Sequence, residues 1–152
     1  MKSEKNDKKT PSRHSLLTET ALAAAFAALI LLATAYLPRI PVGNGGYIHA
    51  GDAVLFAAAA LLSPFGAAAA GAAGETLADL LSGAAVWAPA TFIIKMLMAL
   101  IFCFGAGFAR KNADRRSEVR LLTLRAVAAA VAAGIVGAAG YFFYEGFLYS
   151  FP

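Results

Sequence analysis

Charged residues and cysteine are both scarce in this sequence. Only 14% of its 152 residues are charged and 60% belong to the hydrophobic set, whereas soluble domains carry roughly 25% charged residues. This composition excludes a soluble globular domain and indicates a membrane protein. The single cysteine, Cys103, excludes an intrachain disulfide, and its apolar surroundings in the sequence predict a buried, unreactive thiol.

Motifs for catalysis and nucleotide binding are absent as well. Gly66 and Gly71 have the spacing of a phosphate-binding loop, but Ala72 and Ala73 stand where lysine and serine or threonine would hold phosphate and magnesium. No nucleophile is accompanied by an acid/base pair. We therefore expect no enzymatic activity and no cofactor. The basic residues lie beside apolar runs without an aromatic platform, so no nucleic-acid partner is expected.

What the sequence has in excess is small and apolar residues. Alanine and glycine make up 51 of the 152 residues, which suits helices that pack closely in lipid. The apolar runs predict an all-α integral membrane protein with five transmembrane helices, because a bilayer core of about 30 Å needs roughly 20 helical residues. We expect these helices at about 16–37, 47–62, 65–82, 88–109 and 121–149, with a loop at 38–46. Residues 1–15 are expected to form a basic tail and residues 16–152 a single transmembrane domain.

The distribution of lysine and arginine predicts the orientation. Five of the 13 lie in residues 1–13 and six in residues 110–125, and these two segments fall on one side if four helices cross. The positive-inside rule makes that side cytoplasmic. We therefore expect a multi-pass protein of the cell membrane with a cytoplasmic N-terminus.

Ionisable residues within the spans are candidate functional residues, because they are expensive in lipid. We expect five of them in the outer half of the membrane, namely Asp52, Glu75, Asp79, Lys95 and Glu145. Glu75 and Lys95 are each seven residues from an outer helix end, about 10 Å deep at 1.5 Å per residue. The two side chains are therefore predicted to meet as an ion pair, and this pair suits a structural role as well as it suits contact with a ligand.

Spacing predicts that polar side chains share helix faces. Glu75 and Asp79 lie on one face of their helix, and Trp87, Thr91 and Lys95 follow one another at intervals of four. The segment 43–52, which runs into the second helix, adds three further candidates, Asn44, Tyr47 and His49. Together these residues predict an outward-facing small-molecule pocket with Glu145 at its rim.

For two features of this region, the sequence favours a structural role over a role in ligand binding. No cysteine or second histidine accompanies His49, so packing in a loop is favoured over metal binding and no metal site is expected. The aromatic residues at 141–151 are typical of a membrane-interface belt, with one or two of them expected to reach the pocket.

Four segments of the sequence form an ordered set of motifs: residues 47–54 (YIHAGDAV), 61–66 (LLSPFG), 74–83 (GETLADLLSG) and 87–95 (WAPATFIIK). Taken in order, they resemble the S component of an energy-coupling factor (ECF) vitamin transporter. The four motifs are most similar to the branch of riboflavin-type or unassigned specificity. Together they are specific for the family, although each motif alone is weak evidence for it. Asp52, Asp79 and Lys95 fall on these motifs, whereas Glu75 occupies a position where the family more often has a small residue, which makes it a candidate for specificity.

The resemblance implies a six-helix membrane protein that binds a vitamin or vitamin precursor from outside the cell. Such proteins work with a membrane T component and two ABC ATPase subunits, and they dock through small residues on the first helix. Small residues recur there at helical spacing at Ala21, Ala24, Ala25 and Ala28. Since the family has six helices and five are predicted here, we expect a sixth helix to be missing from this sequence.

Two questions stay open at this stage. The ligand suited to an aromatic pocket with both signs of charge is riboflavin, a pyridoxine-like compound, a thiamine precursor or a similar heterocycle. The alternative class of protein is a self-sufficient proton-coupled carrier or small channel. That class would need a polar route through both leaflets, whereas the cytoplasmic halves of the predicted helices are mostly alanine, leucine and phenylalanine.

Overall fold

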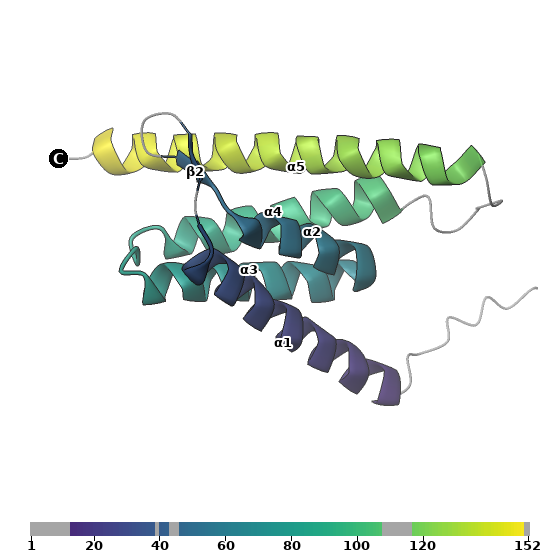
Figure 1. Cartoon of the computed structure of the whole chain (residues 1–152). Coiled ribbons are helices and arrows are strands. Elements are labelled where there is room, and N and C mark those ends of the chain that lie inside the picture. Colours follow the sequence, from purple (N-terminus) through teal and green to yellow (C-terminus); the bar gives the residue numbers. More distant parts are fainter. Residues whose placement is uncertain (1–12, 39, 43–45, 108–116, 151–152) are drawn as a thin grey trace, which may run out of the picture.

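The chain folds into a bundle of five helices with one short hairpin (Figure 1). The structure, a computed structural model, describes residues 13–38, 40–42, 46–107 and 117–150. The helices are α1 (Arg13–Tyr36), α2 (Ala50–Leu61), α3 (Pro64–Leu81), α4 (Ala88–Gly107) and α5 (Ser117–Ser150). The expected all-α class and the five helices are confirmed.

The largest difference from expectation lies before α2. The predicted helix at 47–62 begins only at Ala50, and the predicted loop contains two antiparallel strands, β1 (Ile40–Val42) and β2 (Gly46–Ile48). Tyr47 and Ile48 continue the apolar run of α2 in sequence, but aromatic and β-branched residues also favour a strand, and here they pair with β1. His49 then ends the strand segment and caps α2 with an extended backbone (φ −135°, ψ 159°).

The other helix ends differ from the predicted ones by a few residues, and local capping explains two of them. Ser63 and Pro64 end α2 and also start α3: the Ser63 hydroxyl accepts a hydrogen bond from the Gly66 amide at 3.1 Å, and Pro64 occupies the first turn. Gly83, with φ 79°, follows the end of α3, and the Ala84 amide donates to the Asp79 carbonyl at 2.8 Å. This is the six-to-one hydrogen bond of a Schellman motif. At the other end of the chain, α5 begins at Ser117 and not near 121.

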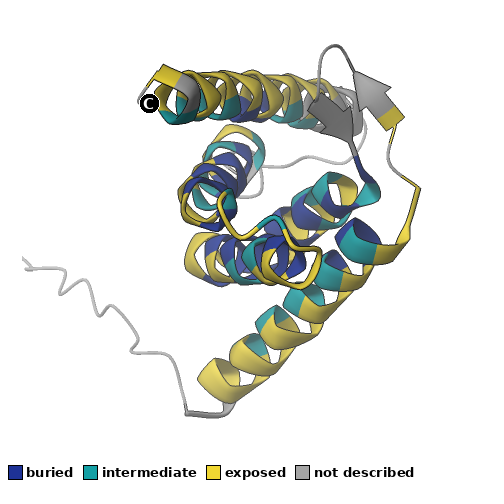
Figure 2. Cartoon of the chain, turned by 90° about the vertical axis from the view of Figure 1, so that its left-hand side faces the viewer, coloured by how far each residue is buried: buried dark blue, intermediate teal, exposed yellow. Residues whose placement is uncertain are grey.

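The central helix of the bundle is α3, which packs against α1, α2 and α4, while α5 packs on α4. Viewed along the bundle, α1 and α5 lie on opposite sides and are largely exposed, whereas the inner faces of α3 and α4 are buried (Figure 2). The close contact of α1 with α3 requires a glycine, because a Cβ at Gly74 would lie 2.6 Å from the carbonyl oxygen of Ala27.

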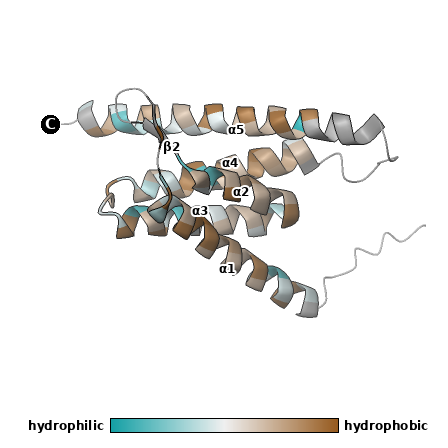
Figure 3. Cartoon of the chain, in the orientation of Figure 1, coloured by the Kyte–Doolittle hydropathy of each residue, from teal (hydrophilic) through white to brown (hydrophobic). Residues whose placement is uncertain are grey.

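Hydropathy follows this arrangement. Within the residues that the structure describes, three helices are long and apolar enough to cross a membrane, at Ser15–Tyr36, Ala88–Ala106 and Leu124–Leu148, and apolar colour runs along much of each (Figure 3). The 12 residues of α2 extend only about 18 Å at 1.5 Å per residue. α3 carries Glu75 and Asp79, and the bundle tolerates these two charges because both side chains are buried in protein.

The two ends of the bundle differ in character. The start of α1, the end of α4 and the start of α5 lie at one end, which we call the basic end. The hairpin, the α3–α4 turn and the end of α5 lie at the other, which we call the hairpin end (Figure 1). Between them the core is apolar, with Leu55, Ala58, Met98 and Phe102 among its buried members. Cys103 is buried in this core and its thiol lies 3.3 Å from the Ala59 carbonyl, so the predicted buried cysteine is confirmed.

Candidate functional site

Polar side chains gather inside the bundle toward its hairpin end. Among the residues that the structure describes, six buried side chains are polar or charged: Thr34, His49, Glu75, Asp79, Thr91 and Lys95. They come from α1, from the residue that caps α2, and from α3 and α4, so elements far apart in the sequence converge here. We call these six residues, together with Asp52, the polar cluster.

Lys95 is the cation of the polar cluster. Its ammonium group forms an ion pair and hydrogen bond with Oδ1 of Asp52, in the first turn of α2. The Lys95 side chain is 3% exposed and that of Asp52 is 27% exposed. The predicted pairing of Lys95 with Glu75 is therefore corrected, because the direct partner of Lys95 is an aspartate on a different helix.

Glu75 instead faces His49. The Nε2 atom of His49 lies 3.7 Å from Oε2 of Glu75 and 3.7 Å from Oδ2 of Asp52. The other ring nitrogen, Nδ1, lies 3.4 Å from the hydroxyl of Thr34 on α1. Glu75 is 2% exposed, and its Oε1 atom has no hydrogen-bond partner within the described part of the chain.

Asp79 belongs to a chain of hydrogen bonds that reaches α5. The Thr91 hydroxyl donates to Oδ2 of Asp79 at 2.5 Å, and the Tyr141 hydroxyl donates to Thr91 at 3.1 Å. The Tyr141 ring also lies beneath the Lys95 ammonium, 5.8 Å from ring centre to nitrogen, within the range of a cation–π contact. These contacts connect the parts of α3, α4 and α5 toward the hairpin end into one polar network.

Aromatic side chains cover this network. The ring of Trp87 lies 6.2 Å from that of Tyr141 and 5.6 Å from that of Tyr144, and the Tyr144 hydroxyl donates to the Val86 carbonyl at 2.7 Å. Three phenylalanines of the same segment, by contrast, are exposed on the bundle surface, at Phe142, Phe143 and Phe147. The aromatic end of α5 is thus divided between inward contacts and a face suited to lipid.

The structure brings most of the predicted pocket residues together and separates others. Trp87 and the members of the polar cluster form one continuous group, but Glu145 is exposed on α5, outside it. Asn44 lies outside the described residues, and Tyr47 is placed only as a backbone position in β2. Thr34 was not predicted, although a threonine in the apolar second half of α1, two residues before the helix ends, is a signal that points to an inward hydrogen bond.

The predicted docking residues of α1 lie on the surface. Ala21, Ala24, Ala25 and Ala28 are all exposed, whereas Ile30 and Ala33, farther along the helix, are buried. α1 thus presents a surface of small side chains that is not used for packing within the described bundle (Figure 2).

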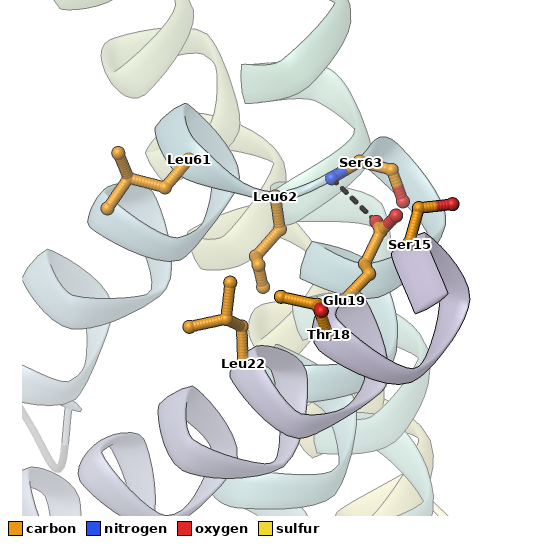
Figure 4. A pocket seen from close by; sticks show the side chains of 7 residues that line it. All are labelled: Ser15, Thr18, Glu19, Leu22, Leu61, Leu62 and Ser63. Atoms are coloured by element: carbon orange, nitrogen blue, oxygen red, sulfur yellow. Dashed lines mark hydrogen bonds between the residues drawn. The ribbon is translucent and has the colours of Figure 1, made fainter. Parts of the chain in front are cut away.

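A surface pocket of about 440 Å³ lies away from the polar cluster, between the first turns of α1 and the α2–α3 junction (Figure 4). Its main polar contact is the hydrogen bond from the Ser63 amide to Glu19 at 3.0 Å. This contact holds the start of α1 against the start of α3 at the basic end.

An apolar helical bundle that encloses charged side chains defines the class: an all-α integral membrane protein with a buried polar site. The chain matches the family model of the ECF-type riboflavin transporter, S component, over residues 15–151, and it belongs to that family. No curated protein and no solved structure matches it. The expected resemblance is therefore confirmed, and the chain is a component of a vitamin-uptake transporter, not an enzyme.

Proposed function

We propose that this chain captures riboflavin or a related heterocyclic vitamin from outside the cell and delivers it through a complex with a T component and two ABC ATPase subunits. The observation that carries this proposal is the polar cluster, which is enclosed by the outer parts of α2, α3 and α4 in a chain of this family. Enclosed polar groups with an aromatic cover are the ordinary makeup of a small-molecule site.

The orientation follows from the two ends of the bundle. We propose that the basic end is cytoplasmic, together with the tail formed by residues 1–15, because 11 of the 13 lysines and arginines lie in residues 1–13 and 110–125. Residues 16–152 would then form one transmembrane domain with its hairpin end toward the outside. The polar cluster would be reached from that side.

Within the site, each kind of side chain has a distinct proposed role. Trp87 offers a flat apolar surface to a heterocyclic ring, while Thr91, Asp79 and Lys95 offer hydrogen-bond donors and acceptors of both signs. His49, Asp52 and Glu75 form the inner wall, with Asn44 and Tyr47 entering from the hairpin segment and Glu145 at the outer rim.

The surface formed by Ala21, Ala24, Ala25 and Ala28 is the proposed contact with the T component. Small side chains allow another helix to approach closely, and such packing drives helix association in lipid. All four residues are exposed in this chain.

A self-sufficient carrier or channel is less well supported. It would need polar side chains along a route through both leaflets, whereas the core toward the basic end contains Leu62, Phe102 and Ala129. Uptake measured in cells with and without the T and ATPase subunits distinguishes the two classes, because a self-sufficient carrier retains uptake when those subunits are deleted.

Riboflavin binding tests the proposed site directly. Purified protein in detergent is titrated with riboflavin, and binding is followed by the change in flavin fluorescence. We expect Lys95→Ala to weaken binding at least tenfold, whereas Arg125→Ala, at an exposed position on α5, leaves it unchanged. Unchanged affinity in folded Lys95→Ala protein would remove Lys95 from the site, and mass spectrometry of the co-purified small molecule identifies the vitamin if riboflavin does not bind.

A further inference from the structure

We propose that His49, Asp52 and Glu75 form a binding site for a divalent cation, of which Zn²⁺ is the best fit. The sequence argues against a metal at His49, because no cysteine or second histidine accompanies it. The fold supplies two ligands from elsewhere, one in the first turn of α2 and one on α3. This inference concerns an ion and does not depend on which vitamin is bound.

The distances suit an ion better than direct hydrogen bonds. One ligand atom from each of the three residues lies within 4.8 Å of the others, and the His49 Nε2 atom is 3.7 Å from each carboxylate. A hydrogen bond from nitrogen to oxygen normally extends to about 3.2 Å. Two ligands on one Zn²⁺ ion with bonds of about 2.0–2.1 Å are separated by roughly 3.3 Å in a tetrahedron, so a small inward movement would complete the site.

Each ligand residue is also oriented by its surroundings. The contact of His49 Nδ1 with Thr34 directs Nε2 toward the two carboxylates. Lys95 binds Oδ1 of Asp52, and Oδ2 is the atom that faces His49. Partners of this kind beyond the ligands are typical of metal sites, where they hold the imidazole and carboxylate in position.

An independent observation points to a missing ligand. Glu75 is 98% buried, given its 2% exposure, and its Oε1 atom has no hydrogen-bond partner among the described residues. Buried carboxylate oxygens are nearly always satisfied, so this atom calls for an additional positively charged or hydrogen-bonding group. The other oxygen of the same carboxylate, Oε2, faces His49, so the buried Glu75 carboxylate borders the space between the three residues.

Charge balance favours a divalent ion over a monovalent one. With all three carboxyl groups ionised, Asp52, Glu75 and Asp79 carry three negative charges and Lys95 carries one positive charge, so the formal net charge of the polar cluster is −2 with neutral His49. An uncompensated charge of this size is expensive within a membrane. A single divalent ion neutralises it.

The donor set selects the type of ion. One imidazole nitrogen with two carboxylate oxygens suits Zn²⁺, whereas Mg²⁺ and Ca²⁺ prefer oxygen ligands throughout. Three protein ligands are also the number found at zinc sites that keep a further position open. Gly51 supports the close approach of these groups, since a Cβ there would overlap the Thr34 hydroxyl and lie 2.6 Å from Oε1 of Glu75.

Isothermal titration with ZnCl₂ tests the proposal on the full chain. The protein is purified without a histidine tag, stripped with EDTA and kept free of vitamin. We expect one saturable ion per chain and at least tenfold weaker binding in His49→Gln and Glu75→Gln. The matched controls are His14→Gln, which replaces the second of the two histidines, and Glu4→Gln, in the N-terminal segment, and both should bind zinc like the unmodified chain.

Several results would overturn the site. They are a lack of saturable binding to the unmodified chain, binding in folded His49→Gln or Glu75→Gln that equals the controls, and an equal loss in the His14→Gln control. If both site variants fail to fold, ZnCl₂ must still raise the thermal unfolding midpoint of the unmodified chain, and an unchanged midpoint counts against the proposal. Riboflavin titration of the EDTA-treated chain separates the two proposals, because vitamin binding without zinc binding refutes only the ion site.

Discussion

Breaking the ion pair between Lys95 and Asp52 should destabilise this protein more than any exposed charge substitution. The Lys95 side chain is 3% exposed and that of Asp52 is 27% exposed. Removal of one partner of a buried pair costs about 3–5 kcal/mol, because the other charge stays buried without compensation. The two single substitutions should therefore differ in the unfolding free energy they lose, and the loss should be larger where the remaining charge is less exposed.

Asp52→Asn leaves the enclosed ammonium group without its direct partner, so we expect a loss near the upper end, about 5 kcal/mol of unfolding free energy. Lys95→Met preserves side-chain length and leaves a carboxylate that water still reaches, so we expect a loss near about 3 kcal/mol. The double variant removes both charges. It should be more stable than the sum of the single losses predicts, by about 2–3 kcal/mol.

The assay is equilibrium unfolding in mixed micelles without vitamin, followed through the fluorescence of Trp87, which is the only tryptophan in the sequence. Trp87 packs against Tyr141 and Tyr144 beside the polar cluster, so its emission reports this region. Arg125→Met, at an exposed position on α5, is the control and should change stability by less than about 0.5 kcal/mol. Additive losses in the double variant, or single losses as small as that of the control, would refute the reasoning.

Three further predictions concern packing, docking and the aromatic cover. Gly74→Ala should lower the free energy of unfolding by about 1–3 kcal/mol through overpacking, since its Cβ would meet α1. Gly134→Ala, with no atom within 4 Å of the added Cβ, should leave stability unchanged or raise it by up to about 1 kcal/mol. Thermal unfolding compares the two variants, and equal midpoints would contradict the close contact of α1 with α3. Ala25→Trp should leave riboflavin affinity unchanged and abolish uptake in cells that express the T and ATPase subunits, so normal uptake would exclude docking through this face. Tyr144→Phe removes the hydrogen bond to the Val86 carbonyl and should lower stability by about 1 kcal/mol with a shift in tryptophan emission; no change in either measurement would mean that this contact does not hold α5.

Much of the fold was predictable because the lipid environment makes hydrophobic length informative. Uninterrupted apolar runs predicted the five helices, and three of them are apolar and long enough to span by themselves. The start of α2 was not predictable in the same way. Tyr47 and Ile48 suit an apolar helix and a strand equally well, and only pairing with β1 assigns them to the hairpin.

The burial of two charged candidates was predictable from the sequence, but their contacts were not. Helical rise predicts equal depths for Glu75 and Lys95, which stays a prediction, and the structure shows that both side chains are buried within the bundle. Rise along one helix says nothing about which neighbouring helix each side chain faces. Thr34 on α1 could be recognised as part of the site only once α1 was packed against α3.

The sequence by itself determined the class of protein, the number of helices and the clustering of ionisable residues toward one end. Composition and run length decide these properties because the free energy of placing a residue in lipid depends mainly on its own side chain. The tertiary structure decided that Lys95 binds Asp52, that His49 lies between two carboxylates, and that Glu145 stays outside. Those contacts depend on how the helices rotate and cross, which is set by the packing of many side chains at once.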